Sequence, residues 1–236
     1  MNLCIDRLPQ GQSLLRPESH CDACGRRLRW FELVPVASIL ALRGRCRTCC
    51  FPIPWRVLAV EVISAITFGY LGLRYGVSGE GLALAVYAMV FVAIFFIDLE
   101  QGIIPDRLVY PASAAALGLS LLIPQVGFWR AVLGASVGFG IMLAVYLASR
   151  GGMGAGDVKF AGLIGLAVGF PLVLPALVLA CMAGGGVAAL LLARRRKRGR
   201  DAIPFGPFLA GGAITSLLWG QPLMHQWSGL FWGGTL

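Results

Sequence analysis

The chain has 236 residues, of which 58% are hydrophobic and only 13% are charged, about half the charged share of roughly 25% in an average globular protein. Its mean hydropathy is +0.79 and its formal net charge at pH 7 is +9. Such a composition excludes a soluble domain of this size and a disordered chain, and 7 cysteines are too few for a secreted disulfide scaffold. It predicts a polytopic membrane protein.

The first 56 residues differ from the rest of the chain. They hold 9 of the 20 Lys and Arg residues and include four cysteines in two closely spaced pairs. A stretch this polar is not expected to span a bilayer. We therefore predict a small soluble domain over residues 1–56 and a membrane domain over residues 57–236.

The membrane domain is predicted from apolar runs separated by short polar breaks. Most of the runs are close to the roughly 20 residues that a helix needs to cross about 30 Å of hydrocarbon. The fold class predicted from them is all-α, with about seven transmembrane helices. The predicted spans cover residues 57–73, 81–98, 108–124, 130–148, 157–171, 175–193 and 204–220.

The basic residues of the chain indicate its orientation. With seven spans, 18 of the 20 Lys and Arg residues fall on the side of the membrane that holds residues 1–56. The positive-inside rule makes this side cytoplasmic. The fifth span is short and rich in glycine, but it keeps the basic run at 194–198 on that side. The positive charge thus indicates orientation and contact with lipid headgroups, not nucleic acid.

Two Cys-x-x-Cys pairs in the first domain predict a metal site. Cys21 and Cys24 form the first pair, and Cys46 and Cys49 form the second after 21 intervening residues. Four thiolates in this arrangement complete a closed tetrahedral zinc site of the structural kind. A redox pair and unliganded thiols are the alternatives, and Cys50 could replace Cys49 as the fourth ligand.

Two aspartates lie at predicted cytoplasmic ends of spans. Asp98 ends an apolar run, and Asp157 lies in a glycine-rich segment. Ionisable groups at this depth indicate a functional site, and two close carboxyls can share the work of acid and base. The pair therefore suggests an aspartic peptidase, with glycines that would admit a substrate backbone. The alternative is that both aspartates only cap helix ends.

Two other acidic residues have simpler interpretations. Glu61 lies near the start of the first span, where it could line a polar cavity or reach back to Arg56. Asp106 follows Pro105 in a cytoplasmic loop, and capping of the next helix is enough to explain it.

Six motifs in order along the chain resemble the prepilin leader peptidases and N-methyltransferases of type IV pilus and type II secretion systems. Any one of them is weak, but the ordered set is specific and runs nearly from end to end of the chain. The motifs are Arg7-Leu8-Pro9 with Ser19 to Gly25; Leu42 to Cys49; Val60-Glu61; Ile97-Asp98 with Ile104-Pro105-Asp106; Gly154-Ala155-Gly156-Asp157-Val158-Lys159; and Ile203 to Phe208.

The resemblance implies a reaction, a place and a cofactor. Asp98 and Asp157 would be the catalytic pair, and Gly154 to Asp157 would be the family's GxGD signature. The enzyme would lie in the bacterial inner membrane and cleave the basic leader of prepilins or pseudopilins after a glycine, on the cytoplasmic side. S-adenosylmethionine would then methylate the new N-terminus, although no residues are identified as its binding site.

One departure from the family and two alternative functions remain. Family members usually have a transmembrane helix before the Arg-Leu-Pro motif, whereas six residues precede Arg7 here, so we expect seven helices in place of eight. The first alternative is an ion- or proton-coupled transporter that uses Glu61, Asp98 and Asp157. The second is a thiol oxidoreductase, which the cytoplasmic placement of the cysteines disfavours.

Overall fold

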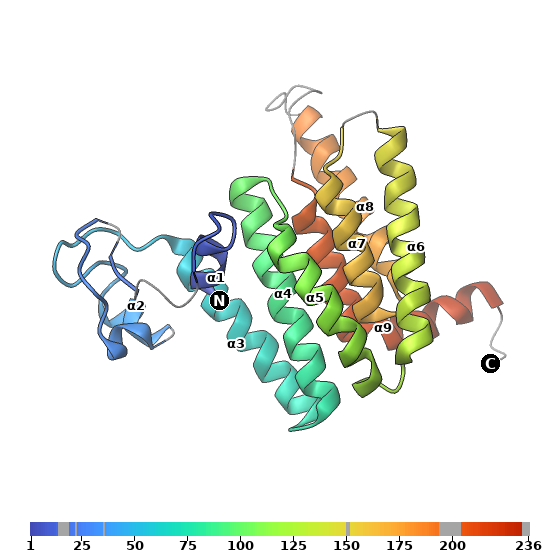
Figure 1. Cartoon of the computed structure of the whole chain (residues 1–236), viewed down its shortest axis with the longest axis horizontal. Coiled ribbons are helices and arrows are strands. Elements are labelled where there is room, and N and C mark those ends of the chain that lie inside the picture. The colour runs from blue at the N-terminus through green and yellow to red at the C-terminus, as the bar shows by residue number, and fades with distance from the viewer. Residues whose placement is uncertain (14–18, 22, 35, 150–151, 194–203, 233–236) are drawn as a thin grey trace.

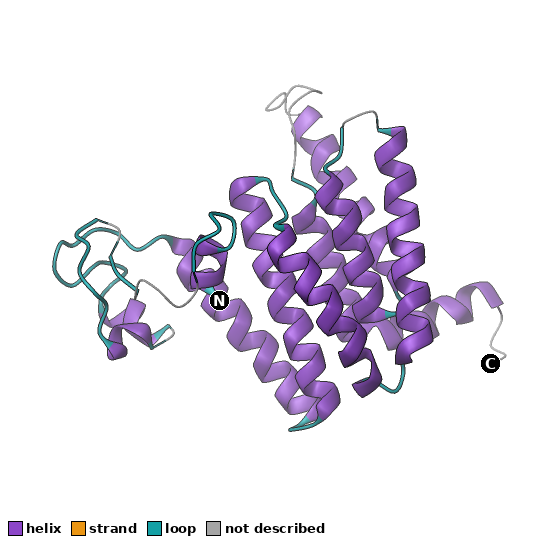
Figure 2. Cartoon of the chain, in the orientation of Figure 1, coloured by secondary structure: helices purple, strands orange, loops and turns teal. Residues whose placement is uncertain are grey.

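A computed structural model of the chain describes residues 1–13, 19–21, 23–34, 36–149, 152–193 and 204–232. These residues contain helices and loops but no β-strand, only two isolated β-bridges. A bundle of long helices makes up most of the molecule, and a loop-rich region lies beside it (Figures 1 and 2). The predicted all-α fold class is confirmed for this part of the chain.

In the described part of the chain, three short helices precede the bundle and seven longer ones form it. The short ones are α1 (Asn2–Arg7), the 3-10 helix η1 (Trp30–Leu33) and α2 (Ala37–Ala41). The bundle contains α3 (Trp55–Tyr75), α4 (Gly79–Gln101), α5 (Asp106–Leu119) with the 3-10 turn η2 (Ser120–Leu122), α6 (Gly127–Ala148), α7 (Ala155–Val168), α8 (Val173–Ala193) and α9 (Gly206–Trp232).

Each of the seven predicted spans coincides with one bundle helix. Within the described residues, four of these helices are long and apolar enough to cross a membrane: α3, α4, α6 and α8. Helices α5 and α7 have 14 residues each, which at 1.5 Å per residue is about 21 Å, less than the ~30 Å of a hydrocarbon core. A multi-pass membrane protein is therefore supported, and the number of seven crossings stays a prediction.

Local sequence sets the ends of α4, which carries one of the two aspartates. The Ser78 hydroxyl accepts a hydrogen bond from the Gly81 N–H and caps the first turn. Gly102, with φ at +66°, adopts the left-handed conformation that ends the helix, and its N–H donates to the carbonyl of Asp98. Asp98 is thereby fixed one turn from the end of α4.

The α6 and α7 helices pack through small residues, so their backbones nearly touch. A Cβ atom added to Gly165 would lie 2.1 Å from the carbonyl oxygen of Gly134, and one added to Gly138 would lie 2.6 Å from that of Ala161. Helix α8 meets α9 in the same way at Gly212. Close contact through small residues is typical of helices that associate inside membranes.

Of the four helices that are long and apolar enough to cross a membrane, α4 is the most buried. In its most apolar stretch, 61% of the residues are buried, compared with 22% in α3, α6 and α8. It packs against α9, α3 and α5, and it lies between α3 and the rest of the bundle (Figure 1). The other three helices are left more exposed, and the most buried of the four carries Asp98.

The N-terminal region divides into two parts by its packing. Ile5 of α1 is fully buried in a cluster with Val60 and Phe96 of α3 and α4. Residues 19–54 form mostly loops and turns to one side of α3 (Figure 2). The boundary at residue 56 remains a prediction. The basic run at 194–200, which entered the charge count, lies outside the described residues.

Candidate active site

Asp98 is buried where α4 and α9 meet. The residue is only 4% exposed. The backbone N–H of Gly206, the first residue of α9, donates a 2.9 Å hydrogen bond to Asp98 Oδ2. A Cβ at position 206 would lie 2.6 Å from that same oxygen. The close approach of α9 to the carboxylate therefore depends on a glycine at this position.

Asp157 is buried in the first turn of α7. The residue is 7% exposed, and its carboxylate lies next to Gly154, the N-cap residue of the helix. A carboxylate in the first turn interacts favourably with the helix dipole, so Asp157 helps to stabilise the start of α7. The position at the start of α7 fits the helix-end role that the sequence offers as the alternative, and the catalytic role of Asp157 stays a prediction.

The glycines next to Asp157 contact the protein itself. A Cβ at Gly154 would lie 3.3 Å from Asp157 Oδ2, and one at Gly156 would lie 3.0 Å from the Cβ of Ile104. Ile104 belongs to the segment that links α4 to α5. The sequence predicts that these glycines admit a substrate backbone. They also have a structural role, because they bring Asp157 close to the end of α4.

The fold brings the two aspartates to the same end of the bundle. Helices α4 and α7 run in opposite directions, and their Phe91 and Phe160 rings meet edge to face with centroids 5.7 Å apart. Asp98 lies two turns beyond Phe91 and Asp157 one turn before Phe160, so both point toward the same end. The two carboxyl groups are near enough to interact electrostatically.

A lysine beside the aspartates ties α7 to α5. Lys159 Nζ lies 2.8 and 2.9 Å from the two carboxylate oxygens of Asp106 and 5.3 Å from the centre of the Tyr110 ring. The side chain of Asp106 makes no capping hydrogen bond to its helix; Pro105 is the N-cap residue. The interpretation of Asp106 as a helix cap is therefore wrong, and its partner is Lys159.

Glu61 and Arg56 connect the loop region to the bundle. Glu61 Oε2 accepts a 2.7 Å hydrogen bond from the backbone N–H of Val36. Arg56 forms ion pairs with Asp6 at 2.6 Å and with Glu100 at 2.9 Å. The predicted approach of Glu61 to Arg56 is thus wrong. Both residues of α3 instead hold neighbouring segments in place, and Glu100 lies two residues beyond Asp98.

The four predicted cysteine ligands converge. The sulfur atoms of Cys21, Cys24, Cys46 and Cys49 lie within 4.8 Å of one another, and the Cys21–Cys49 sulfur distance is 3.8 Å. A tetrahedral zinc ion with Zn–S bonds of about 2.3 Å requires sulfur atoms about 3.8 Å apart. This donor set fits zinc, and it includes Cys49 rather than its neighbour Cys50.

Backbone groups prepare the cluster for a cation. The N–H groups of Cys49 and Thr48 donate to the Cys46 sulfur and lower the pKa of Cys46 to about 6. The N–H of Phe51 likewise favours the Cys49 thiolate, but burial and the other three sulfurs raise the pKa of Cys49 to about 12. A divalent cation bound by the four sulfurs would favour their thiolate forms.

An ion pair lies next to the cysteine cluster. The Arg26 guanidinium donates two hydrogen bonds to Glu32, at 2.8 and 3.0 Å. Together with the N–H of Arg29, Arg26 lowers the pKa of Glu32 to about 2. Arg26 also contacts the Cys46 sulfur. The cysteine cluster is therefore in contact with the Arg26 guanidinium, which stays ionised at any physiological pH.

The sequence alone does not single out one residue of the candidate site. Gly206 appears there only as part of the Ile203–Phe208 motif, of which Ile203 lies outside the described residues. The structure gives the motif a physical role, because α9 begins at Gly206 and points its first amide at Asp98. Pro207 in the first turn of α9 was the available signal, since proline is typical of helix N-termini.

Comparison with known proteins identifies two matching families. Residues 1–75 match the bacterial peptidase A24 N-terminal domain, and residues 85–189 match the type IV leader peptidase family. The first match covers the cysteine cluster and α3, and the second covers both aspartates. No solved structure is significantly similar to the chain.

Several characterised proteins are similar over most of their length. The prepilin leader peptidase/N-methyltransferase of Burkholderia pseudomallei (strain 1026b) is 37% identical over 223 residues, which is 92% of this chain and 72% of the relative. The enzyme of the same name from Bacillus subtilis (strain 168) is 31% identical over 92% of this chain and 88% of the relative. The enzyme of the same name from Pseudomonas putida is 36% identical over 89% of this chain and 75% of the relative.

Proposed function

The chain belongs to the type IV leader peptidase family, and we propose that it is a membrane aspartic endopeptidase that uses Asp98 and Asp157 to remove the leaders of prepilins or pseudopilins. The observation that carries this proposal is the burial of two carboxyl groups from different helices at one end of the bundle, 4% and 7% exposed. Such a pair is costly to bury and suits catalysis by shared acid and base.

The chemistry needs one proton shared between the carboxyls. The ionised carboxylate removes a proton from a water molecule while the protonated carboxyl donates its proton to the carbonyl oxygen of the scissile peptide. The C–N bond of the resulting tetrahedral intermediate then breaks, and the leaving amine takes up a proton. The Gly206 N–H fixes the orientation of Asp98 for these transfers.

The substrate and its side of the membrane follow from the family and from the charge count. We propose cleavage after a glycine that follows a short basic leader, on the cytoplasmic side. The 18-to-2 distribution of Lys and Arg supports this side for the end that holds the aspartates. Asp98 and Asp157 both lie within one turn of helix ends on that side.

The cysteine cluster is proposed to hold a structural zinc ion through Cys21, Cys24, Cys46 and Cys49. The ion would join two loop segments that have few buried apolar residues of their own, as structural zinc does in small domains. We further propose that N-methylation of the cleaved substrate uses S-adenosylmethionine, in line with the names of the relatives.

Cleavage of a prepilin with a Gly-Phe junction by the purified chain in liposomes tests the peptidase. Asp98→Asn and Asp157→Asn should each abolish cleavage while the protein keeps its helicity and zinc content. Asp106→Asn is the matched control, since it removes an exposed carboxylate at the same end. It should retain activity within about fivefold, because an exposed ion pair contributes at most about 1 kcal/mol.

Cleavage near the wild-type level in either buried-aspartate variant would contradict the catalytic pair. If the wild-type chain also fails to cleave while folded and zinc-loaded, a non-enzymatic role such as ion transport becomes the better explanation. Methyl transfer is followed separately, by the incorporation of labelled methyl groups into a substrate that has already been cleaved.

A further inference from the structure

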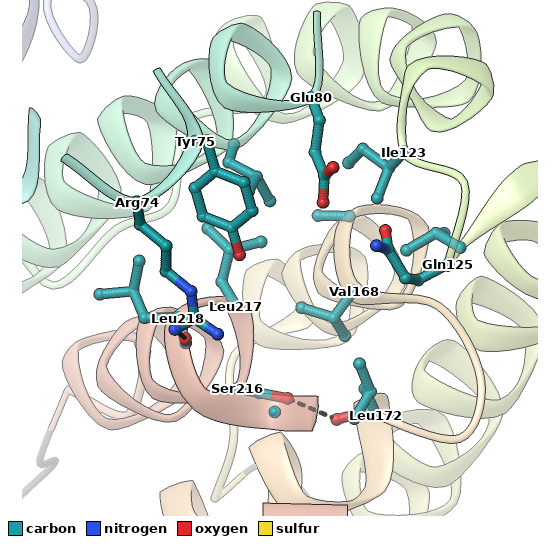
Figure 3. Close-up of a pocket in the computed structure, with 14 residues that line it drawn as sticks. Arg74, Tyr75, Glu80, Ile123, Gln125, Val168, Leu172, Ser216, Leu217 and Leu218 are labelled. Atoms are coloured by element: carbon teal, nitrogen blue, oxygen red, sulfur yellow. Dashed lines mark hydrogen bonds between the residues drawn. The ribbon is translucent and has the colours of Figure 1, made fainter. Parts of the chain in front are cut away.

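A cavity of about 230 Å³ lies at the end of the bundle opposite the aspartates (Figure 3). Residues from the ends of α3, α4 and α7 and from the middle of α9 line it, together with the segments that precede α6 and α8. Leu84 of α4 is 14 residues from Asp98, which corresponds to about 21 Å along the helix. The cavity is therefore separate from the proposed catalytic site.

One side of the cavity carries a guanidinium group that is held in place. Arg74 Nη1 donates to the Tyr70 hydroxyl at 2.6 Å and to the Leu218 carbonyl at 2.9 Å. The guanidinium also lies 5.9 and 5.6 Å from the ring centres of Tyr70 and Tyr75. These contacts, which include two cation–π interactions, fix the cation and leave its other N–H groups available.

The other side carries a carboxylate. Glu80, in the first turn of α4, points into the cavity beside Gln125, and the Tyr75 ring lies between Glu80 and Arg74 (Figure 3). Among the described residues, no ion pair joins Glu80 to Arg74. The cavity thus presents a positive and a negative group that are kept apart, an arrangement that complements a ligand with two opposite charges.

The surroundings of the cavity resemble a membrane–water boundary. Among the side chains that the structure describes, Trp129 is 74% exposed and Trp219 is 45% exposed at this end, and Trp219 contacts Tyr70. Aromatic residues gather where proteins meet the headgroup layer. Apolar side chains complete the lining beside the charges: Leu84, Ile123, Val126, Val168, Leu172 and Leu217.

The geometry points to a binding site for a phosphoethanolamine headgroup, with its phosphate on Arg74 and its ammonium on Glu80. A guanidinium suits a phosphate because its N–H groups match the phosphate oxygens. An ammonium has three N–H donors for the carboxylate of Glu80 and the amide oxygen of Gln125. The apolar lining would receive the glycerol end and the first methylenes of the acyl chains.

Other headgroups complement the cavity less well. Phosphocholine carries the same charges, but its trimethylated nitrogen has no N–H to donate to Glu80. Phosphoglycerol has no cation and would place its phosphate near an unpaired carboxylate. The site therefore predicts an order of retention in which phosphatidylethanolamine exceeds phosphatidylcholine and phosphatidylglycerol, even though the net charge of the protein is +9.

Native mass spectrometry of the purified full chain with each of the three phospholipids tests the site. We expect one tightly retained phosphatidylethanolamine, and at least tenfold weaker retention in Arg74→Gln and in Glu80→Gln. Arg45→Gln is the control, because it removes an exposed cation from the loop region and should change nothing. Soluble glycerophosphoethanolamine, added as a competitor, shows whether the headgroup alone suffices or the lipid chains are needed.

Equal retention of phosphatidylglycerol by the wild-type chain would overturn the proposal, since it would indicate attraction to the cation alone. Unchanged retention in either variant would do the same. The comparison of the three lipids uses only the wild-type chain, so it decides the matter even if a variant folds poorly. None of these readouts depends on peptidase activity.

Discussion

Different interactions stabilise the loop region of residues 19–54 and the helical bundle of residues 55–220. The loop region places four sulfur atoms within 4.8 Å of one another and has little buried apolar surface. The bundle has a large buried core, and its helices approach most closely where side chains are absent, as at Gly134 and Gly165. The proposed zinc ion would stabilise the loop region, whereas packing stabilises the bundle.

The difference teaches where each region is vulnerable. A metal-bound region loses its structure when ligands or metal are removed, because few other contacts replace them. A close-packed bundle tolerates the loss of single polar contacts but not added volume at its helix crossings. The two regions meet through the ion pairs of Arg56 and the contact of Glu61 with Val36, so damage to one can be measured in the other.

The largest expected effect separates the two regions. Cys21→Ser combined with Cys46→Ser should remove about one zinc ion per chain, because coordination in structural sites contributes on the order of 10 kcal/mol. Residues 19–54 should then become sensitive to trypsin while the bundle keeps its helicity. Metal analysis and limited proteolysis provide the measurement.

Cys50→Ser combined with Cys181→Ser is the matched control for the cysteine variant. Both of these cysteines are exposed and lie outside the cluster, so zinc content should not change. Full metal content after loss of Cys21 and Cys46 would refute the proposed ligand set.

The second effect is confined to the bundle. Gly165→Leu must displace backbone, since even a Cβ would lie 2.1 Å from the carbonyl oxygen of Gly134. We expect a loss of more than about 3 kcal/mol, enough to prevent recovery of folded protein. Size-exclusion chromatography in detergent shows the outcome, with Gly140→Leu as the control.

Gly140 belongs to α6, is exposed and has nothing within 4 Å of an added Cβ. The same substitution there should leave the amount of folded protein unchanged. Equal behaviour of the two leucine variants would mean that close backbone contact does not hold the bundle together.

A smaller effect, on the rate of cleavage, is expected when the packing next to Asp98 is changed. Gly206→Ala puts a methyl group where only 2.6 Å separate the new carbon from Asp98 Oδ2, so α9 or the carboxylate must move. We expect cleavage to fall by roughly 10- to 100-fold in a folded protein, since misplacement by about 1 Å can cost that much. Initial cleavage rates measure the effect.

Gly211→Ala is the control in the same helix, because nothing lies within 4 Å of its added Cβ. It should cleave at the wild-type rate. A Gly206→Ala variant that matches it would show that the contact of α9 with Asp98 is not needed for catalysis.

The smallest effect concerns the ion pair between α5 and α7. The side chains of Lys159 and Asp106 are 31% and 52% exposed, so their coupling should be about 0.2–1 kcal/mol. A double-mutant cycle with Asp106→Asn and Lys159→Gln, followed by denaturation in mixed micelles, gives this number. Coupling should decrease as salt is added, and coupling that salt leaves unchanged would argue for a water-excluded pair.

Much of the fold was predictable because its signals are local. Seven apolar runs became seven helices, and two Cys-x-x-Cys pairs became one cluster of sulfurs. Each signal lies within a segment of a few residues to about 20. The prediction of Asp98 and Asp157 rested on the same kind of signal, a carboxylate at the end of an apolar run.

The partners of polar groups were less predictable because they depend on how distant segments meet. Gly206 and Asp98 are separated by 108 positions, and Arg74 and Leu218 by 144. Glu61 pairs with a backbone N–H that no side-chain pattern reveals. Asp106 had a sufficient local explanation as a helix cap, yet its partner lies 53 positions away.

The short length of α5 has a consequence for the lipid around the enzyme. This helix presents Tyr110 and Leu117 outward, and with η2 its 17 residues reach about 25 Å. Lipids beside it would need to compress their acyl chains, at a cost of a fraction of a kcal/mol per Å. Because α5 also carries Asp106, the partner of Lys159, a change in membrane thickness would act on the segment that lies beside Asp157.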